Sequence, residues 1–191
     1  YGFSNALGFH VFVGGPIRYR IYQTAGLDAA DVGRIVGVSL LTFSAGLTAL
    51  TGTALLLDPA GVPALHFLSV TDDRLIGGAI IAMLGLLLVW LSRGPRTLSA
   101  FGWSFTLPSA GSTALQILIG AVDIGAAAGA LYLLLPADVA PGFAAFLLIF
   151  VAAVIAGIIS HAPGGLGVLE AGILLGLGAG ARPDVVAALV V

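Results

Sequence analysis

The stretch FAAFLLIFVAAVIAGIISHAPGGLGVLE, residues 143–170, joins a long apolar run to a segment that cannot continue as a regular helix. The run from Phe143 to Ile159 carries no charge and approaches the length that crosses the hydrocarbon core of a bilayer. Backbone amides in hydrocarbon must be satisfied within their own segment, so such a run spans as an α-helix. Pro163 and the glycines that follow it interrupt the helix. This stretch predicts a helical membrane protein with a broken element after its last full span.

Three other stretches have the same character, and composition supports the same class. Of the 191 residues, 59% are hydrophobic and only 8% are charged, and mean hydropathy is +1.14. Soluble domains carry about 25% charged residues, so this chain cannot build a water-facing surface. We predict an all-α, polytopic helical bundle that forms one transmembrane domain over residues 1–191. The expected spans lie near 35–57, 75–92, 113–135 and 143–159.

Two further apolar stretches are too short to cross a bilayer. Tyr1 to Val13 runs into Gly14-Gly15-Pro16, and Ala171 to Ala181 lies between glycine-rich segments. Paired Gly/Pro interruptions are typical of transporters built from repeats, in which they mark the substrate site. We therefore expect re-entrant or half-helix elements near 1–16 and 160–181. Both ends of the chain are expected to be cut, because it opens on a tyrosine and closes inside an apolar run.

Loop charges predict the orientation of the bundle. All seven basic residues are arginine, and loops 14–34 and 93–112 hold five of them, whereas loops 58–74 and 136–142 are net acidic. Because arginine-rich loops stay on the cytoplasmic side, 14–34 and 93–112 are expected to be cytoplasmic. The pairs Gly125/Gly129 and Gly172/Gly176 have the small-xxx-small spacing of close helix contacts, so we interpret them as packing positions. A homodimer through such faces is left open.

Asp123 is the first candidate functional residue, because it lies near the middle of the third predicted span. An acid at that depth costs roughly 2.5 to 3.5 kcal/mol on insertion scales, so it is expected to face a cavity or a partner. A neutral Asp123, hydrogen-bonded to a neighbouring helix, is the alternative. We favour the functional interpretation.

The loop from Ser160 to Glu170 is the most distinctive segment. Breaking the helix here leaves backbone amides free to bind an anion such as a lipid phosphate, in a nest or at the start of the next half-helix. A tight cytoplasmic turn is the alternative, although it would not need to be so apolar or to carry Glu170. The supporting residues of this loop are His161, Pro163, Gly164, Gly165 and Gly167.

Arginines follow the first glycine break. A guanidinium binds phosphate with two parallel hydrogen bonds, which makes Arg18 a candidate, whereas Arg20 fits a positive-inside anchor. Nucleophile elbows, zinc-protease motifs and phosphate loops are missing from the sequence, and there is no cysteine. We therefore expect no catalytic residue, metal or cofactor within residues 1–191, and no nucleic-acid partner.

Three segments resemble the transmembrane flippase domain of the multiple peptide resistance factor, also called the lysylphosphatidylglycerol synthetase membrane region. They are Ser4-Asn5-Ala6-Leu7-Gly8-Phe9, the run from Gly14 to Tyr22, and above all Ser160 to Glu170 with its Pro-Gly-Gly-Leu-Gly and closing acid. The resemblance covers nearly the whole chain by the order and spacing of these segments. It makes Asn5 and Arg20 supporting residues.

The resemblance implies a bacterial inner-membrane protein that moves aminoacylated phosphatidylglycerol, lysyl or alanyl, to the outer leaflet and so resists cationic antimicrobial peptides. It implies that Arg18, Asp123 and Glu170 stand at the family's functional positions and approach one polar cavity. Some relatives exchange the two acids, which preserves charge and changes reach. The segment itself is not expected to be an enzyme, whereas its parent is expected to be a phosphatidylglycerol lysyltransferase-type aminoacyltransferase with its catalytic domain elsewhere.

Two rival functions remain open. The segment could serve only as the membrane part of the aminoacyltransferase and give that enzyme access to lipid. It could also be a small-solute or ion transporter, because an acid and an arginine in apolar spans fit an ion path. The glycine-rich loop favours lipid.

Overall fold

The computed structural model describes residues 29–57, 69–94, 97–100, 103–162, 165–180 and 182–190. Within these ranges four helices are long and apolar enough to cross a membrane, which confirms the predicted all-α polytopic bundle. The elements are α3 (Ala29–Leu57), α4 (Val70–Ser92), β1 (Thr97–Ala100), β2 (Trp103–Thr106), α5 (Ala110–Leu134), α6 (Phe143–Ser160), α7 (Val168–Leu177) and α8 (Pro183–Val190).

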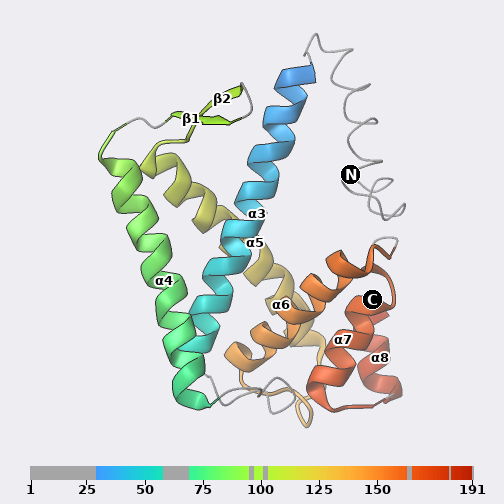
Figure 1. The fold of residues 1–191 in the computed structure, drawn as a ribbon. Coiled ribbons are helices and arrows are strands. Elements are labelled where there is room, and N and C mark those ends of the chain that lie inside the picture. Colours follow the sequence, from blue (N-terminus) through green and yellow to red (C-terminus); the bar gives the residue numbers. More distant parts are fainter. Residues whose placement is uncertain are drawn as a thin grey trace.

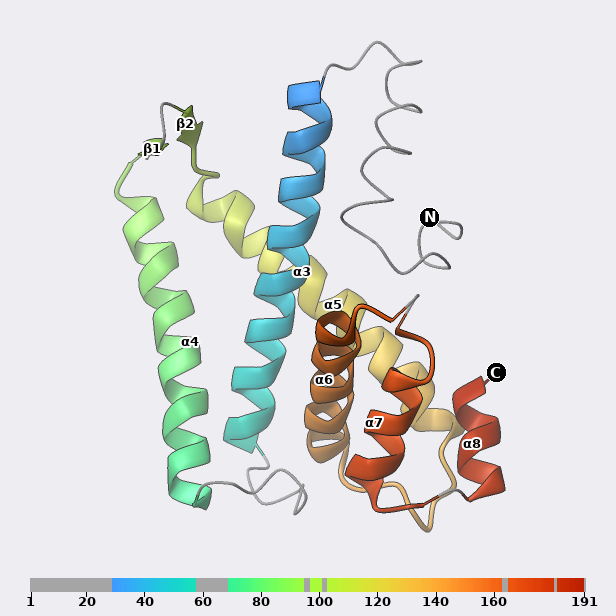
Figure 2. The same cartoon turned by 45° about the vertical axis from the view of Figure 1, so that its right-hand side comes forward.

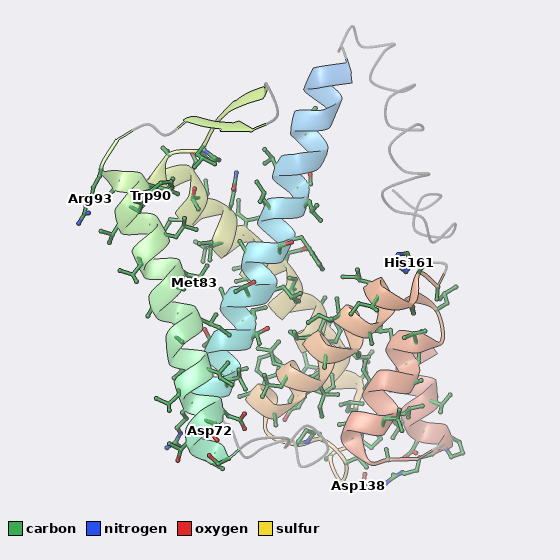
Figure 3. All side chains as sticks on the ribbon, viewed as in Figure 1. Asp72, Met83, Trp90, Arg93, Asp138 and His161 are labelled. Atoms are coloured by element: carbon green, nitrogen blue, oxygen red, sulfur yellow. The ribbon has the colours of Figure 1, made fainter. Side chains whose placement is uncertain are left out.

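The helices run up and down between two ends of the bundle (Figures 1 and 2). The β1–β2 hairpin and the start of α3 lie at one end, which we call the hairpin end. The α5–α6 connection lies at the opposite end, where Asp72 and Asp138 are found (Figure 3). We call this the aspartate end. The predicted element near 1–16 lies outside the described residues.

Helices α4 and α5 begin several residues before the starts predicted from apolar character. The Ser69 hydroxyl accepts a hydrogen bond from the amide of Asp72 at 3.2 Å, and the Asp72 carboxylate accepts from the amide of Ser69 at 3.3 Å. This reciprocal capping box satisfies two amides at the start of α4. Ser109 caps α5 by accepting from the amide of Ser112 at 3.2 Å. Polar first turns therefore extend both helices beyond their apolar spans.

A short antiparallel hairpin lies in the loop expected over 93–112, where the sequence analysis placed no strand. β1 and β2 pair from Thr97 with Thr106 to Ala100 with Trp103. The pairing satisfies backbone groups that a loop would leave to water or headgroups. It leaves the fold class unchanged, because each strand has only four residues.

Glycine positions hold the long helices together. A Cβ on Gly46 of α3 would overlap the backbone of Gly120 on α5, and a Cβ on Gly120 would overlap the carbonyl group of Thr42. On the other side of α3, a Cβ on Gly77 of α4 would lie 2.8 Å from the carbonyl oxygen of Gly52. The backbones approach this closely only because side chains are absent, which is how small residues drive packing in lipid.

The two glycine pairs singled out from spacing behave differently. A Cβ on Gly172 would lie 2.9 Å from that of Ala153 on α6, and one on Gly176 would overlap Ile149, so this pair packs α7 onto α6 as predicted. Around Gly125 and Gly129 no atom of the described chain lies within 4 Å of such a Cβ. On α5 the packing interpretation is therefore wrong for the described residues. Spacing alone does not tell which face of a helix meets a neighbour.

Helix α6 is the centre of the apolar core. Eight of its residues are buried, against three on α5. Phe146 is fully buried and lies 5.4 Å from the ring of Tyr132, measured between ring centroids. The Tyr132 hydroxyl donates to the Pro141 carbonyl oxygen at 2.8 Å, so its polar atom is satisfied at the helix end. A helix that is apolar all round is stable where it is surrounded, and α6 is surrounded from Ala145 to Ala153.

Arg182 ties α8 to the aspartate end. Its Nη1 donates to Asp138 Oδ2 at 2.6 Å, and its Nε and Nη2 donate to the two oxygens of Asp184 at 3.1 and 2.6 Å. Val185, the next residue, is completely buried. Hydrogen bonds from the Arg182 guanidinium lower the pKa of both carboxyls, and these carboxylates raise the pKa of Arg182.

This ion-pair cluster predicts how α8 responds to acid. A carboxyl whose pKa is lowered by folding contributes stability above its ordinary pKa of 3.8 and loses it as the pH falls through the lower folded value. We therefore expect amide hydrogen exchange over Val186–Leu189, corrected for intrinsic rates, to be equally protected at pH 7 and 5 and less protected below 3.8. Arg182→Gln should remove this acid-dependent step. Protection that falls between pH 7 and 5 would contradict the assignment.

Candidate functional site

The turn between α6 and α7 is the break that the sequence predicted after the last full span. Helix α6 ends with His161 in the left-handed region at φ 53°. The His161 Nδ1 lies 2.7 Å from the carbonyl oxygen of Ile159. A carbonyl only accepts, so Nδ1 carries the proton and Nε2 is left as an acceptor in the neutral ring. Pro163 and Gly164 lie outside the described residues.

Positive φ angles continue through the rest of the turn. Gly165 and Gly167 have φ of 69° and 80°, which side chains rarely adopt. The Gly165 amide donates to the Ala162 carbonyl at 2.9 Å, and the Ala162 amide donates to the Ser160 hydroxyl at 3.2 Å. These bonds fold the chain back on itself between two antiparallel helices. The predicted supporting residues His161, Gly165 and Gly167 therefore shape the turn.

Glu170 closes the turn at the start of α7. Its Oε2 accepts a hydrogen bond from the Gly167 amide at 2.7 Å. Gly167 has no side chain to cap the helix, so the carboxylate reaching back is the cap, and the helix dipole favours its negative charge. The sequence analysis expected free amides that bind an anion here. In the structure one of these amides is taken, and an incoming phosphate would have to displace a carboxylate.

The turn lies part-way along the bundle, between the hairpin end and the aspartate end. Helix α7 has ten residues and so rises about 15 Å, half of the roughly 30 Å hydrocarbon core. Its far end leads to Arg182, which binds Asp138 at the aspartate end. In Figure 3 His161 lies between the level of Arg93 and the levels of Asp72 and Asp138. Helices α6 and α7 therefore form a helical hairpin that turns back before it reaches the hairpin end.

Asp123 lies near the middle of α5, between Ala110 and Leu134. The residue is exposed in the described chain, and no described residue gives its carboxylate a hydrogen bond or ion pair. Gln116, seven residues earlier, shares its face of the helix. Gly120, three residues earlier, and Ile124, the next residue, are both buried, so Asp123 lies at the edge of the core face of α5. Asp123 is thus a carboxylate at helical mid-length that the described helices do not cover. Among the described residues neither the cavity nor the partner expected for it is present, so that expectation stays a prediction.

Of the three residues predicted to share a cavity, the structure describes two. No hydrogen bond or ion pair among the described residues joins Asp123 to Glu170. Arg18 lies outside the described residues, as do Asn5 and Arg20. The shared cavity therefore stays a prediction, and so does a common depth in the membrane, because the structure gives only the places of the two acids near the middle of α5 and at the start of α7.

The sequence analysis missed the cluster of Asp138, Arg182 and Asp184. A helix-start signal was present, since proline at the first helical position followed by aspartate is typical of an N-terminus. The pairing with Asp138 spans 44 residues and carries no local signal.

The half-depth of the turn can be measured, because the chain has no cysteine that would need to be removed. Leu166 is 69% exposed, so a cysteine there can carry a bimane fluorophore. We expect stronger quenching by lipids with a nitroxide deep in the acyl chain than by lipids with one near the headgroup. Asp138→Cys, at the aspartate end, should give the opposite order. The same order for both positions would contradict the half-depth turn.

Comparison with known proteins gives two relatives, and no protein-family profile matches the chain. The chain is 35% identical over 175 residues to the uncharacterized protein slr0712 of Synechocystis sp., covering 91% of this chain and 54% of that protein. It is 30% identical over 173 residues to the inner membrane protein YbhN of Escherichia coli, covering 90% of this chain and 53% of YbhN. The chain thus spans about half the length of the curated relatives that it matches.

Proposed function

From the premise that this chain is homologous to the inner membrane protein YbhN, we propose that it is the membrane-embedded part of a bacterial lipid flippase. Its cargo is aminoacylated phosphatidylglycerol, such as the lysyl or alanyl form, carried from the inner to the outer leaflet of the inner membrane. Such transport would give resistance to cationic antimicrobial peptides.

The observation that carries this proposal is the α6–α7 turn, which has Glu170 at the start of the short helix α7, while Asp123 lies near the middle of α5. We propose that both acids lie at half-depth in the membrane. A headgroup that crosses hydrocarbon loses its hydration, and polar groups fixed at mid-membrane can replace it. Transporters use broken helices for this purpose, because unpaired backbone is tolerated only where it lines a cavity.

The sign of the charges supports an ammonium-bearing cargo. Among the described charged side chains, those between the two ends of the bundle are the acids Asp123 and Glu170. Arg93 lies at the hairpin end and Arg182 at the aspartate end. An acid that faces hydrocarbon is costly, and a passing ammonium group would relieve that cost. The phosphate of the same lipid would be bound by Arg18, which the resemblance matches to the family's functional arginine.

The exposure of Asp123 favours lipid over a small solute or ion. A solute path needs walls on all sides, so its acids are enclosed by helices. Asp123 instead lies on a face that the described bundle leaves open to the acyl region. Only a cargo that keeps its tails in the bilayer can use a side-open path.

The proposal is tested in a bacterium that makes lysyl-phosphatidylglycerol with a synthase domain alone. Adding the full-length protein should raise the share of this lipid that reacts with a membrane-impermeant amine label, while total extracted lipid stays constant. Killing by a cationic peptide should fall in parallel. A rise in total lipid with an unchanged labelled share would favour the aminoacyltransferase-access function instead.

A further inference from the structure

Helix α7 has two unlike faces. One packs onto α6 through Gly172, Ile173 and Gly176, with Ile173 completely buried. The other lines an open groove of about 420 Å³, whose walls are Ala171, Leu174, Leu175, Gly178 and Gly180. The first four recur at helical spacing, so the groove follows the helix axis.

The groove has the length and place of one lipid leaflet. It begins next to Glu170 at half-depth and runs toward the loop that carries Arg182, and the helix along which it lies rises about 15 Å. That rise is half of the hydrocarbon core, the depth reached by one acyl chain. Its lining side chains are all apolar, so a hydrocarbon chain suits it.

The charged cluster beyond the Gly180 end of the groove determines which lipid headgroup is favoured there. Asp138, Arg182 and Asp184 form one cluster with a formal charge of −1, and all three side chains are partly exposed. Three of the five N–H donors of Arg182 are taken by two carboxylates, and these carboxylates offset its positive charge. An ammonium group is attracted to this cluster, whereas an anionic headgroup is repelled.

We propose that the α7 groove holds one acyl chain of a phospholipid whose ammonium-bearing headgroup lies against the Asp138–Arg182–Asp184 cluster. We call this lipid-binding position the seat. It rests on the proposed function and specifies where the cargo lipid is bound. If the arginine-rich loops are cytoplasmic, the aspartate end faces outward, and the seat holds the aminoacylated lipid after it has crossed.

A reporter at Leu175 tests the seat. This residue lines the groove and its side chain is 76% exposed. Bimane on Leu175→Cys is therefore quenched by a nitroxide-labelled acyl chain in the groove without occupying the groove itself. The full-length protein is placed in phosphatidylcholine nanodiscs with a small share of acyl-nitroxide phosphatidylethanolamine or phosphatidylglycerol. Leu86→Cys, 69% exposed on α4, is the matched control, because a ratio between lipids cancels differences in depth.

We expect phosphatidylethanolamine to quench at about two- to fivefold lower concentration than phosphatidylglycerol at position 175, and equally at position 86. Asp138→Asn with Asp184→Asn should reverse the preference, because the cluster then carries only the positive charge of Arg182. Ala171→Phe, which fills the groove and leaves the cluster intact, should abolish the preference. Equal quenching by both lipids at position 175 would mean ordinary bilayer contact, and no quenching would mean a protein partner in the groove. Either result overturns the seat.

An Asp123→Ala variant separates this proposal from the proposed function. It should lose translocation but keep the lipid preference at position 175, because Asp123 is not part of the groove. If the preference is absent while translocation still depends on Asp123, only the seat is wrong. If the preference is present and the protein moves no lipid, the flippase function is wrong.

Discussion

Replacing Gly120 with leucine is expected to separate α3 from α5 and to remove most of the folded protein. The Cβ alone would overlap the carbonyl group of Thr42, and this neighbour is backbone, which cannot rotate away. Overpacking commonly costs about 1 to 3 kcal/mol, and a clash with a second helix backbone lies at or above the upper end of that range. Gly46→Leu should have the same effect from the other side of the crossing.

Gly129→Leu is the matched control on the same helix, because no described atom lies within 4 Å of its added Cβ. The measurement is the melting temperature and the monodisperse yield of the detergent-purified protein, followed by fluorescence during size exclusion. Gly129→Leu should resemble wild type, whereas Gly120→Leu should yield little folded protein. Equal melting temperatures for the two variants would contradict the crossing.

Asp123→Ala is expected to leave synthesis of the aminoacylated lipid unchanged while lowering its amount in the outer leaflet. Synthesis would use a separate cytoplasmic domain, whereas crossing needs polar groups inside the bilayer. Leaving a charged headgroup without its partner costs about 1 to 3 kcal/mol or more. Since about 1.4 kcal/mol slows a step tenfold, translocation should fall at least about fivefold. Arg18→Ala should act in the same direction.

The same strain and impermeant amine label serve for this measurement, beside a total-lipid extraction and a check of protein level. Val122→Ala, one residue away and 61% exposed, is the control for a lost side chain without charge. Asp123→Glu should restore part of the activity, because it keeps the carboxylate. Reduced total lipid in Asp123→Ala would point to the synthase-coupled alternative.

The four long apolar helices followed from sequence because hydrocarbon imposes one solution on a long apolar segment. The predicted 143–159 matches α6, Phe143–Ser160, almost residue for residue. The starts of α4 and α5 were placed too late, because Ser69 and Ser109 extend helices into polar surroundings that hydropathy discounts. The break after Ser160 was also visible, since glycine and proline act on the backbone locally.

Features that depend on distant neighbours could not be predicted. Gly120, which meets Gly46, has no spacing signal of its own, whereas Gly125 and Gly129 have the signal and face open space. The Arg182–Asp138 pair joins two loops 44 residues apart. Glu170 was expected to help an anion site, yet its carboxylate caps Gly167, because the glycine leaves that amide without a side-chain partner. These outcomes depend on three-dimensional packing, which one sequence does not encode locally.

The most direct test of the account is translocation by the purified full-length protein in vesicles. Lysyl-phosphatidylglycerol is first confined to the inner leaflet by labelling all outer amines to completion, and the later appearance of new reactive amine is followed in time. We expect wild type and Val122→Ala to expose this lipid at least about fivefold faster than Asp123→Ala or protein-free vesicles. Equal rates in all four preparations would contradict a lipid path past the half-depth carboxylates of α5 and α7.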